Sequence, residues 1–282
     1  MVEKRPLVTI ATHVVLVLGV ILVLLPVWVA FVASTHTSFR LNTGLAPLWP
    51  GTAMLDNYAL IFSEGARRNG LPPVGPMMFN SLVMALGITF GKIVISILSA
   101  FAIVYFRFRF RMAAFWVIFI TLMLPVEVRI VPTFQVVAGF GLLNSYTGLI
   151  LPLIASATAT FLYRQIFLQI PDELLEAARI DGAGPLKFLW DIVVPLTRTS
   201  TAALFVILFV YGWNQYLWPL LVTTQPDFYT IVRGIKGIAT AADSEPVWNL
   251  VMAVAMLAML PPIAVVIFMQ KLFVRGLTET EK

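Results

Sequence analysis

Six long apolar runs constrain the fold of this 282-residue chain more than any other feature. A helix needs roughly 20 apolar residues to cross the ~30 Å hydrocarbon core of a bilayer, and each run reaches that length. The chain is 12% charged, about half the 25% or so of soluble domains. We therefore predict an all-α, polytopic membrane protein with one transmembrane domain over 1–282. Its six spans are expected at 7–33, 77–106, 113–138, 147–168, 200–222 and 247–269.

Basic residues gather at alternate ends of these runs. Both chain ends and the connections 107–112 and 169–199 hold most of the lysines and arginines, whereas 34–76, 139–146 and 223–246 hold few. By the positive-inside rule, both termini and the basic connections are expected in the cytoplasm. A basic stripe on a polar domain would point to nucleic acid. Basic residues at span ends indicate membrane topology instead, with lipid as the surroundings and no nucleic acid.

The connection 169–199 is too polar to span a membrane but has a defined pattern. Pro171, followed by two acidic residues, is typical of a helix start. The run 181–184 is expected to end that helix. Pro185 should begin a second one, which ends at Pro195 and has Leu186, Leu189, Trp190 and Val193 as its apolar stripe. Such a hairpin either lies on lipid headgroups or fits a pocket on another protein. Its amphipathic pattern does not distinguish the two.

The spacing within this connection resembles the EAA loop of ABC importer permeases. Glu176-Ala177-Ala178 is followed after three residues by Gly182, and after nine more by Ile192-x-Val194-Pro195; the family has leucine where Val194 stands. In that family the loop forms a coupling helix seated in a cleft of the ATPase subunit. The resemblance implies that Glu176 pairs with a basic residue there, and that the small residues allow a close fit. The implied coupling set is Glu176, Ala177, Ala178, Asp181, Gly182, Ile192 and Pro195.

Further runs carry a resemblance to the permeases of maltose-type ABC importers: LSAFAIVYFRFRFR, TLMLPVEVRIVP, ASATATFLYRQIF, YGWNQYLWPLL and FVRGLTETEK. It covers nearly the whole chain and is least distinctive in 34–76. It implies the type I permease fold with six transmembrane helices, in the bacterial inner membrane. It also implies a sister permease, two copies of an ATPase bound through the EAA loop, and an external substrate-binding protein. ATP and magnesium would then belong to the ATPase, and this chain would be a transporter subunit without a cofactor.

No catalytic or metal-binding group is predicted on this chain. The stretch 87–93 is one residue short of a phosphate-binding loop and lacks the hydroxyl that would hold magnesium. The histidines, His13 and His36, have no companions at ligand spacing, and the chain contains no cysteine.

Charged residues inside the apolar runs are the candidates for a substrate path. Lys92 lies near the middle of the second run, where a charge costs roughly 2.5–3.5 kcal/mol on insertion scales. Glu127 and Arg129 lie in the third run, too close in sequence to face each other on a regular helix. One interpretation is structural ion pairing with other helices. The other is that Lys92 and Arg129 attract an anionic phosphate in a water-filled path; an uncharged sugar is the alternative cargo.

Polar residues in the fifth run and in the external loop that follows it complete the candidate set. Asn214 and Gln215 must face protein or water, because an unpaired amide is costly in lipid. They are expected to contact either the substrate or the sister subunit, while Trp218 fits an aromatic belt. Lys236 and Gly237 lie in an external loop expected either to contact the binding protein or to remain a plain solvated loop.

Overall fold

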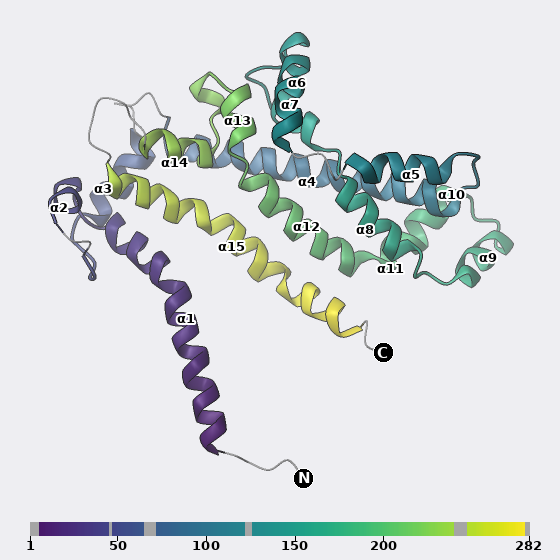
Figure 1. Cartoon of the computed structure of the whole chain (residues 1–282), viewed down its shortest axis with the longest axis horizontal. Helices are drawn as coiled ribbons and strands as arrows, with labels where there is room; N and C mark the ends of the chain where they lie inside the picture. The colour runs from purple at the N-terminus through teal and green to yellow at the C-terminus, as the bar shows by residue number, and fades with distance from the viewer. Residues whose placement is uncertain (1–5, 45–46, 65–71, 122–125, 240–246, 280–282) are drawn as a thin grey trace. The chain divides into compact units, whose positions relative to one another are not determined.

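The computed structural model describes the backbone of residues 6–44, 47–64, 72–121, 126–239 and 247–279. Side chains are described over the same residues apart from 6, 126, 127 and 271–279. Within these ranges every regular element is a helix (Figure 1).

The helices differ widely in length. The long ones are α1 (Pro6–Ser34), α4 (Val74–Tyr105) and α15 (Trp248–Glu279). Those of intermediate length are α3 (Met54–Ser63), α5 (Arg111–Ile120), α6 (Val126–Gly139), α8 (Ala157–Phe167), α9 (Asp172–Ile180), α12 (Arg198–Trp213) and α14 (Ile231–Ala239). The short ones are α2 (Ser38–Asn42), α7 (Tyr146–Ile150), η3 (Leu151–Leu153), α10 (Pro185–Phe188), the π-helical turn η4 (Leu189–Val193), α11 (Val194–Leu196), α13 (Leu217–Val222) and η5 (Pro226–Phe228).

The all-helical membrane architecture is confirmed, but the count of six continuous spans is not. Among the described residues, three helices are long and apolar enough to cross a membrane: α1, α4 and α15. The number of candidate spans rises to five if each of two bent helix pairs is counted as one span. The third predicted span contains α5 and α6, with 122–125 between them outside the described residues. The sixth runs past its predicted end at 269, to Glu279.

The fourth and fifth predicted spans are interrupted, and each interruption has a local cause. In the fourth, α7–η3 and α8 meet at a 50° bend, where the Ser156 hydroxyl caps α8 by accepting from the Ala159 amide. In the fifth, α12 ends at Trp213 and α13 begins at Leu217. Pro219 has no amide hydrogen to donate to the carbonyl of Gln215, so the helical ladder loses one hydrogen bond at this break.

The chain forms two compact units: Met1–Gly75 with Gly234–Leu260, and Pro76–Arg233 with Pro261–Lys282. In the first unit, buried Asn57 connects three segments. Its Nδ2 donates to the carbonyls of Ser34 and His36, each at 2.8 Å, and its Oδ1 accepts from Asn249 at 2.8 Å. Both polar groups of the Asn57 amide therefore have partners, as a buried amide requires.

The second unit has two apolar clusters along α4. One joins α4 to α8, α9, α10, η4 and α12 through buried side chains that include Phe101, Tyr163 and Leu189. The other joins α4 to α6, α7 and α13, with Trp218 buried at its centre. The candidate residues described below, except those on α14, lie on or next to the helices that these two clusters join.

Candidate coupling segment and substrate path

We call residues 171–195 the coupling segment. Pro171 caps α9, whose first turn holds Asp172 and Glu173, so the predicted helix start is confirmed. Gly182, with φ at +73°, makes the predicted turn after α9. The left-handed conformation is open to glycine at little cost. The Ala183 amide donates to the Ala178 carbonyl at 2.8 Å and closes the turn.

The second half of the segment differs from the prediction in two ways. Leu186 and Trp190 are 67% and 60% exposed, while Phe188 and Leu189 are buried. Val193 is buried as well, so the predicted stripe is confirmed at Leu189 and Val193. It is wrong at Leu186 and Trp190, which lie outside the buried face. Pro195 does not end the helical run: it lies in the first turn of α11, where its missing amide hydrogen is not needed. The chain instead bends by 76° at Thr197, before α12.

The coupling set divides into exposed and buried members. Glu176, Ala177, Asp181, Gly182 and Pro195 are exposed, and Ile192 is half-buried. Ala178 is 5% exposed and packs in the same cluster as Phe101 and Phe188. Its small side chain therefore lets α9 approach α4, while Glu176 remains available on the outer surface.

Lys92 lies at mid-length of α4 and is 6% exposed. Its Nζ atom is 3.7 Å from the centre of the Tyr211 ring on α12, a cation–π contact. Sequence reasoning missed Tyr211. The signal available was its position on the apolar run one turn before Gln215.

Arg129 and Gln215 line one small pocket of about 70 Å³, together with Thr133, Pro152 and Trp218. Gln215 is half-buried, and its Nε2 donates to the Tyr211 carbonyl at 3.2 Å. Arg129 is exposed on α6. The break between α12 and α13 thus brings a cation from the third predicted span beside an amide from the fifth.

Asn214 is not among the residues that line this pocket. Asn214, at the C-cap of α12, is exposed. Glu127 belongs to α6, but its side chain lies outside the described residues. Trp218 is 3% exposed, and its Nε1 donates to the Gly148 carbonyl at 3.1 Å. The aromatic-belt interpretation of Trp218 is therefore wrong, because the ring fills the protein interior.

Lys236 and Gly237 lie in a helix rather than the predicted loop. In α14, Ile231, Gly234 and Ile238 are buried at spacings of three and four residues. This regular apolar face stabilises the helix despite its two glycines. Lys236 is exposed and Gly237 is half-buried.

Comparison with known proteins shows the family to which this chain belongs. Residues 92–279 match the family of binding-protein-dependent transport system inner membrane components. The chain belongs to this family, whose members are the membrane permeases of ABC importers.

Similar curated proteins share the full length of the chain. The sn-glycerol-3-phosphate transport system permease proteins UgpE of Agrobacterium fabrum, Rhizobium meliloti and Yersinia enterocolitica are 55%, 54% and 54% identical over 282 residues, each with 100% coverage of both chains.

Two solved structures show the same fold. One is a bacterial ABC transporter involved in import of the acidic polysaccharide alginate, with a TM-score of 0.80, 19% identity, and coverage of 96% of this chain and 98% of that chain. The other is a bacterial alginate ABC transporter in complex with a periplasmic protein that holds an alginate pentasaccharide. Its TM-score is 0.58 at 17% identity, with 92% of each chain covered.

Proposed function

We propose that this chain, acting as one permease domain over 1–282, pairs with a sister permease to form the path for sn-glycerol 3-phosphate. The observation that carries the proposal is the 54–55% identity, over the entire length, with permeases named for that substrate. The full complex also contains two copies of an ATPase, which hold ATP and magnesium, and an external binding protein. Both termini lie in the cytoplasm, as the distribution of basic residues favours.

The coupling segment transmits motion from the ATPase. Exposed Glu176 pairs with a basic residue of the ATPase, and losing one partner of such a desolvated pair costs roughly 2–5 kcal/mol. Ala178 and Leu175 hold α9 against the cluster that contains Phe101 of α4 and Leu208 of α12. A displacement of α9 therefore reaches the helices that carry Lys92 and Tyr211.

The transport cycle is alternating access. ATP closes the ATPase dimer and brings the two coupling helices of the permease pair together. The permeases then open outward and accept substrate from the binding protein, which Lys236 and Gly237 on α14 help to contact. Hydrolysis returns the pair to the inward-facing state.

The substrate path is the region of Lys92, Glu127, Arg129, Asn214 and Gln215. The cations Lys92 and Arg129 supply positive potential for the phosphate dianion. The amides of Asn214 and Gln215 provide donors and acceptors for the glycerol hydroxyls. Glu127 belongs with this region through its place on α6 beside Arg129.

The test is uptake of labelled sn-glycerol 3-phosphate by liposomes containing the complete complex, its binding protein and internal ATP. Unlabelled sn-glycerol 3-phosphate should abolish uptake of the label, and maltodextrins should leave it unchanged. Competition by maltodextrins would contradict the proposal and indicate a neutral-sugar permease. Competition by glycerol phosphodiesters would extend the substrate class without changing the site.

A further inference from the structure

A pocket of about 340 Å³ lies between the end of α4 and the coupling segment. Most of its lining is apolar: Phe101, Phe106, Leu175, Ala178, Ala183, Pro185 and Phe188, with the ring of Tyr105. Its two cations are Arg107, just after α4, and Arg179, in the last turn of α9. The volume falls near the lower end of the range of about 300–1,000 Å³ typical of ligand sites.

The aromatic wall is built into the fold. The Phe101 ring centre lies 5.1 Å from that of Tyr105 and 6.3 Å from that of Phe188, and the Tyr105 and Phe188 centres are 5.2 Å apart. The Tyr105 hydroxyl donates to the Phe167 carbonyl at 3.3 Å, so its polar group already has a partner. The rings are therefore held in place with apolar surface lining the pocket.

The two guanidinium groups are available to an anion. Both arginines are exposed, and over the part of the chain that the structure describes neither has an acidic side chain at ion-pair distance. They come from connections 107–112 and 169–199, both expected on the cytoplasmic side. A single anion between them would join the end of α4 to the coupling helix.

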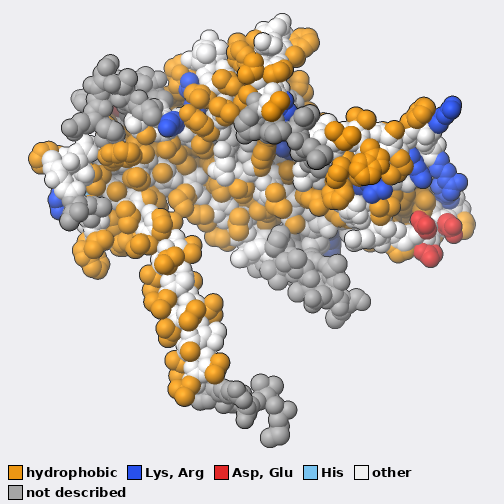
Figure 2. Space-filling view, in the orientation of Figure 1, with side chains coloured by type: hydrophobic (Ala, Val, Ile, Leu, Met, Phe, Trp, Pro, Cys, Tyr) orange, Lys and Arg blue, Asp and Glu red, His pale blue; other side chains and the backbone are white. Residues whose placement is uncertain are grey.

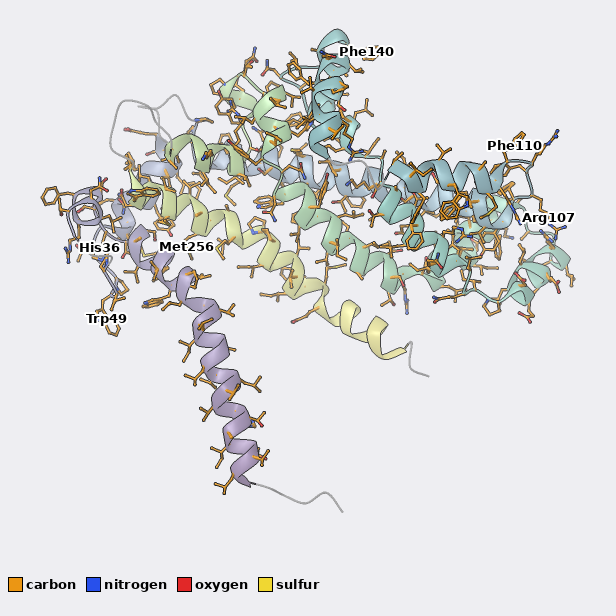
Figure 3. The ribbon with its side chains drawn as sticks, in the orientation of Figure 1. His36, Trp49, Arg107, Phe110, Phe140 and Met256 are labelled. Carbon is orange, nitrogen blue, oxygen red and sulfur yellow. The ribbon has the colours of Figure 1, made fainter. Side chains whose placement is uncertain are left out.

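The chain beside the pocket has the composition of a membrane interface. Residues 106–111 alternate phenylalanine and arginine, and Phe106, Phe108 and Phe110 are 44%, 43% and 67% exposed. Lysine and arginine side chains gather on the surface at this end of the second unit (Figure 2), where Arg107 and Phe110 lie (Figure 3). Exposed phenylalanine rings next to arginines, at the end of a spanning helix, combine apolar surface with the cations that attract anionic headgroups.

We propose that this pocket binds one anionic phospholipid of the cytoplasmic leaflet. Its phosphate lies between Arg107 and Arg179, and the start of an acyl chain lies along Phe101, Phe106 and Phe188. Basic pockets between helices on the cytoplasmic side recognise lipid headgroups in this way. A free phosphate ion satisfies the arginines but leaves the aromatic wall without an apolar ligand, whereas a lipid fills both parts of the pocket.

The test is native mass spectrometry of the complete importer in detergent, titrated with dioleoyl phosphatidylglycerol and, separately, with dioleoyl phosphatidylcholine. The double variant Arg107→Gln/Arg179→Gln removes the anion contacts, and Ala183→Leu fills the pocket while keeping both arginines. Arg109→Gln is the matched control, since Arg109 belongs to the same run but does not line the pocket. The measured mass reports assembly of each variant directly.

We expect one phosphatidylglycerol per copy of this chain to bind at least tenfold more tightly than further lipids. That binding should weaken about tenfold for each guanidinium removed, because charge-assisted contacts are lost. Ala183→Leu should abolish it and Arg109→Gln should retain it. Unchanged binding in both the double variant and Ala183→Leu would overturn the proposal, as would equal binding of phosphatidylcholine. Displacement of the lipid by millimolar inorganic phosphate would overturn it too, by indicating an anion site without a lipid requirement.

Discussion

The Nζ atom of Lys92 lies 3.7 Å from the centre of the Tyr211 ring, so a charge at mid-length of α4 faces the aromatic surface of α12. A desolvated cation–π contact stabilises by about 2 kcal/mol. Tyr211→Leu should therefore destabilise the assembled complex by about that amount, measured as thermal unfolding in detergent. Tyr211→Phe is the control, because it keeps the ring beneath Lys92. Equal losses in the two variants would mean that the contact contributes nothing and that the hydroxyl matters instead.

Arg129 is exposed on α6, whereas Lys92 is buried. Replacing Arg129 should therefore disturb the fold less than replacing Lys92. Arg129→Gln should lower uptake of sn-glycerol 3-phosphate at least tenfold, since the proposed path loses one of its two cations. Arg129→Lys, which keeps the charge, should retain most of the uptake. Size-exclusion chromatography of the complex accompanies both assays. Dissociation of the Arg129→Gln complex would show that this arginine holds the assembly together rather than serving substrate.

The turn of the coupling segment provides a matched pair of glycines. Gly182 has φ at +73°, Gly184 has φ at −71°, and a Cβ added to either would meet nothing within 4 Å. Within this chain, the two substitutions therefore differ only in backbone conformation. The first should cost roughly 1–2 kcal/mol and reduce ATP-dependent uptake, while the second should be nearly neutral.

Asparagine tolerates the left-handed region, so Gly182→Asn should fall between the two alanine variants. Uptake assays on all three variants check this order. Indistinguishable alanine variants would show that the turn does not need the left-handed conformation in the working complex.

Gly212 marks a close approach of α12 to α4. A Cβ added there would lie 3.0 Å from the Ala85 Cα and 3.3 Å from the Ala85 carbonyl oxygen, both of which belong to the backbone. Small residues allow such close contact between membrane helices. Gly212→Ala should cost about 1–3 kcal/mol through overpacking, read as a lower unfolding temperature. Gly139→Ala, which adds a methyl group to open space, should leave that temperature unchanged.

The sequence predicts most of the architecture because lipid leaves a chain few choices. Apolar runs near 20 residues must become helices, and Pro171, Gly182 and Pro185 determine a turn between two short helices through their own backbone preferences. Helix boundaries at these positions agree with the structure. The EAA spacing, rather than amphipathicity, distinguishes a docking element from an interfacial hairpin.

What the sequence leaves open depends on contacts between distant segments. Trp218 is a residue type common at membrane interfaces, yet it is buried here. Its ring nitrogen donates to the Gly148 carbonyl of α7. The local signal at Tyr211, its place one turn before Gln215, does not reveal its partner; α4 brings Lys92 to the face of its ring. Leu186 and Trp190 lie at helical spacing but stay exposed, because the cluster that contains α4 and α8 packs against Leu189 and Val193 instead.

We expect this chain to move substrate only when an ATPase engages Glu176 and the rest of the coupling segment. The most direct measurement is sn-glycerol 3-phosphate uptake in liposomes, with the complete complex compared to this chain alone and to a complex carrying Glu176→Lys. We predict ATP-dependent uptake from the complete complex, none from this chain alone, and a loss of tenfold or more with Glu176→Lys. Uptake by this chain alone without ATP, or full uptake by the Glu176→Lys complex, would contradict this dependence on the ATPase.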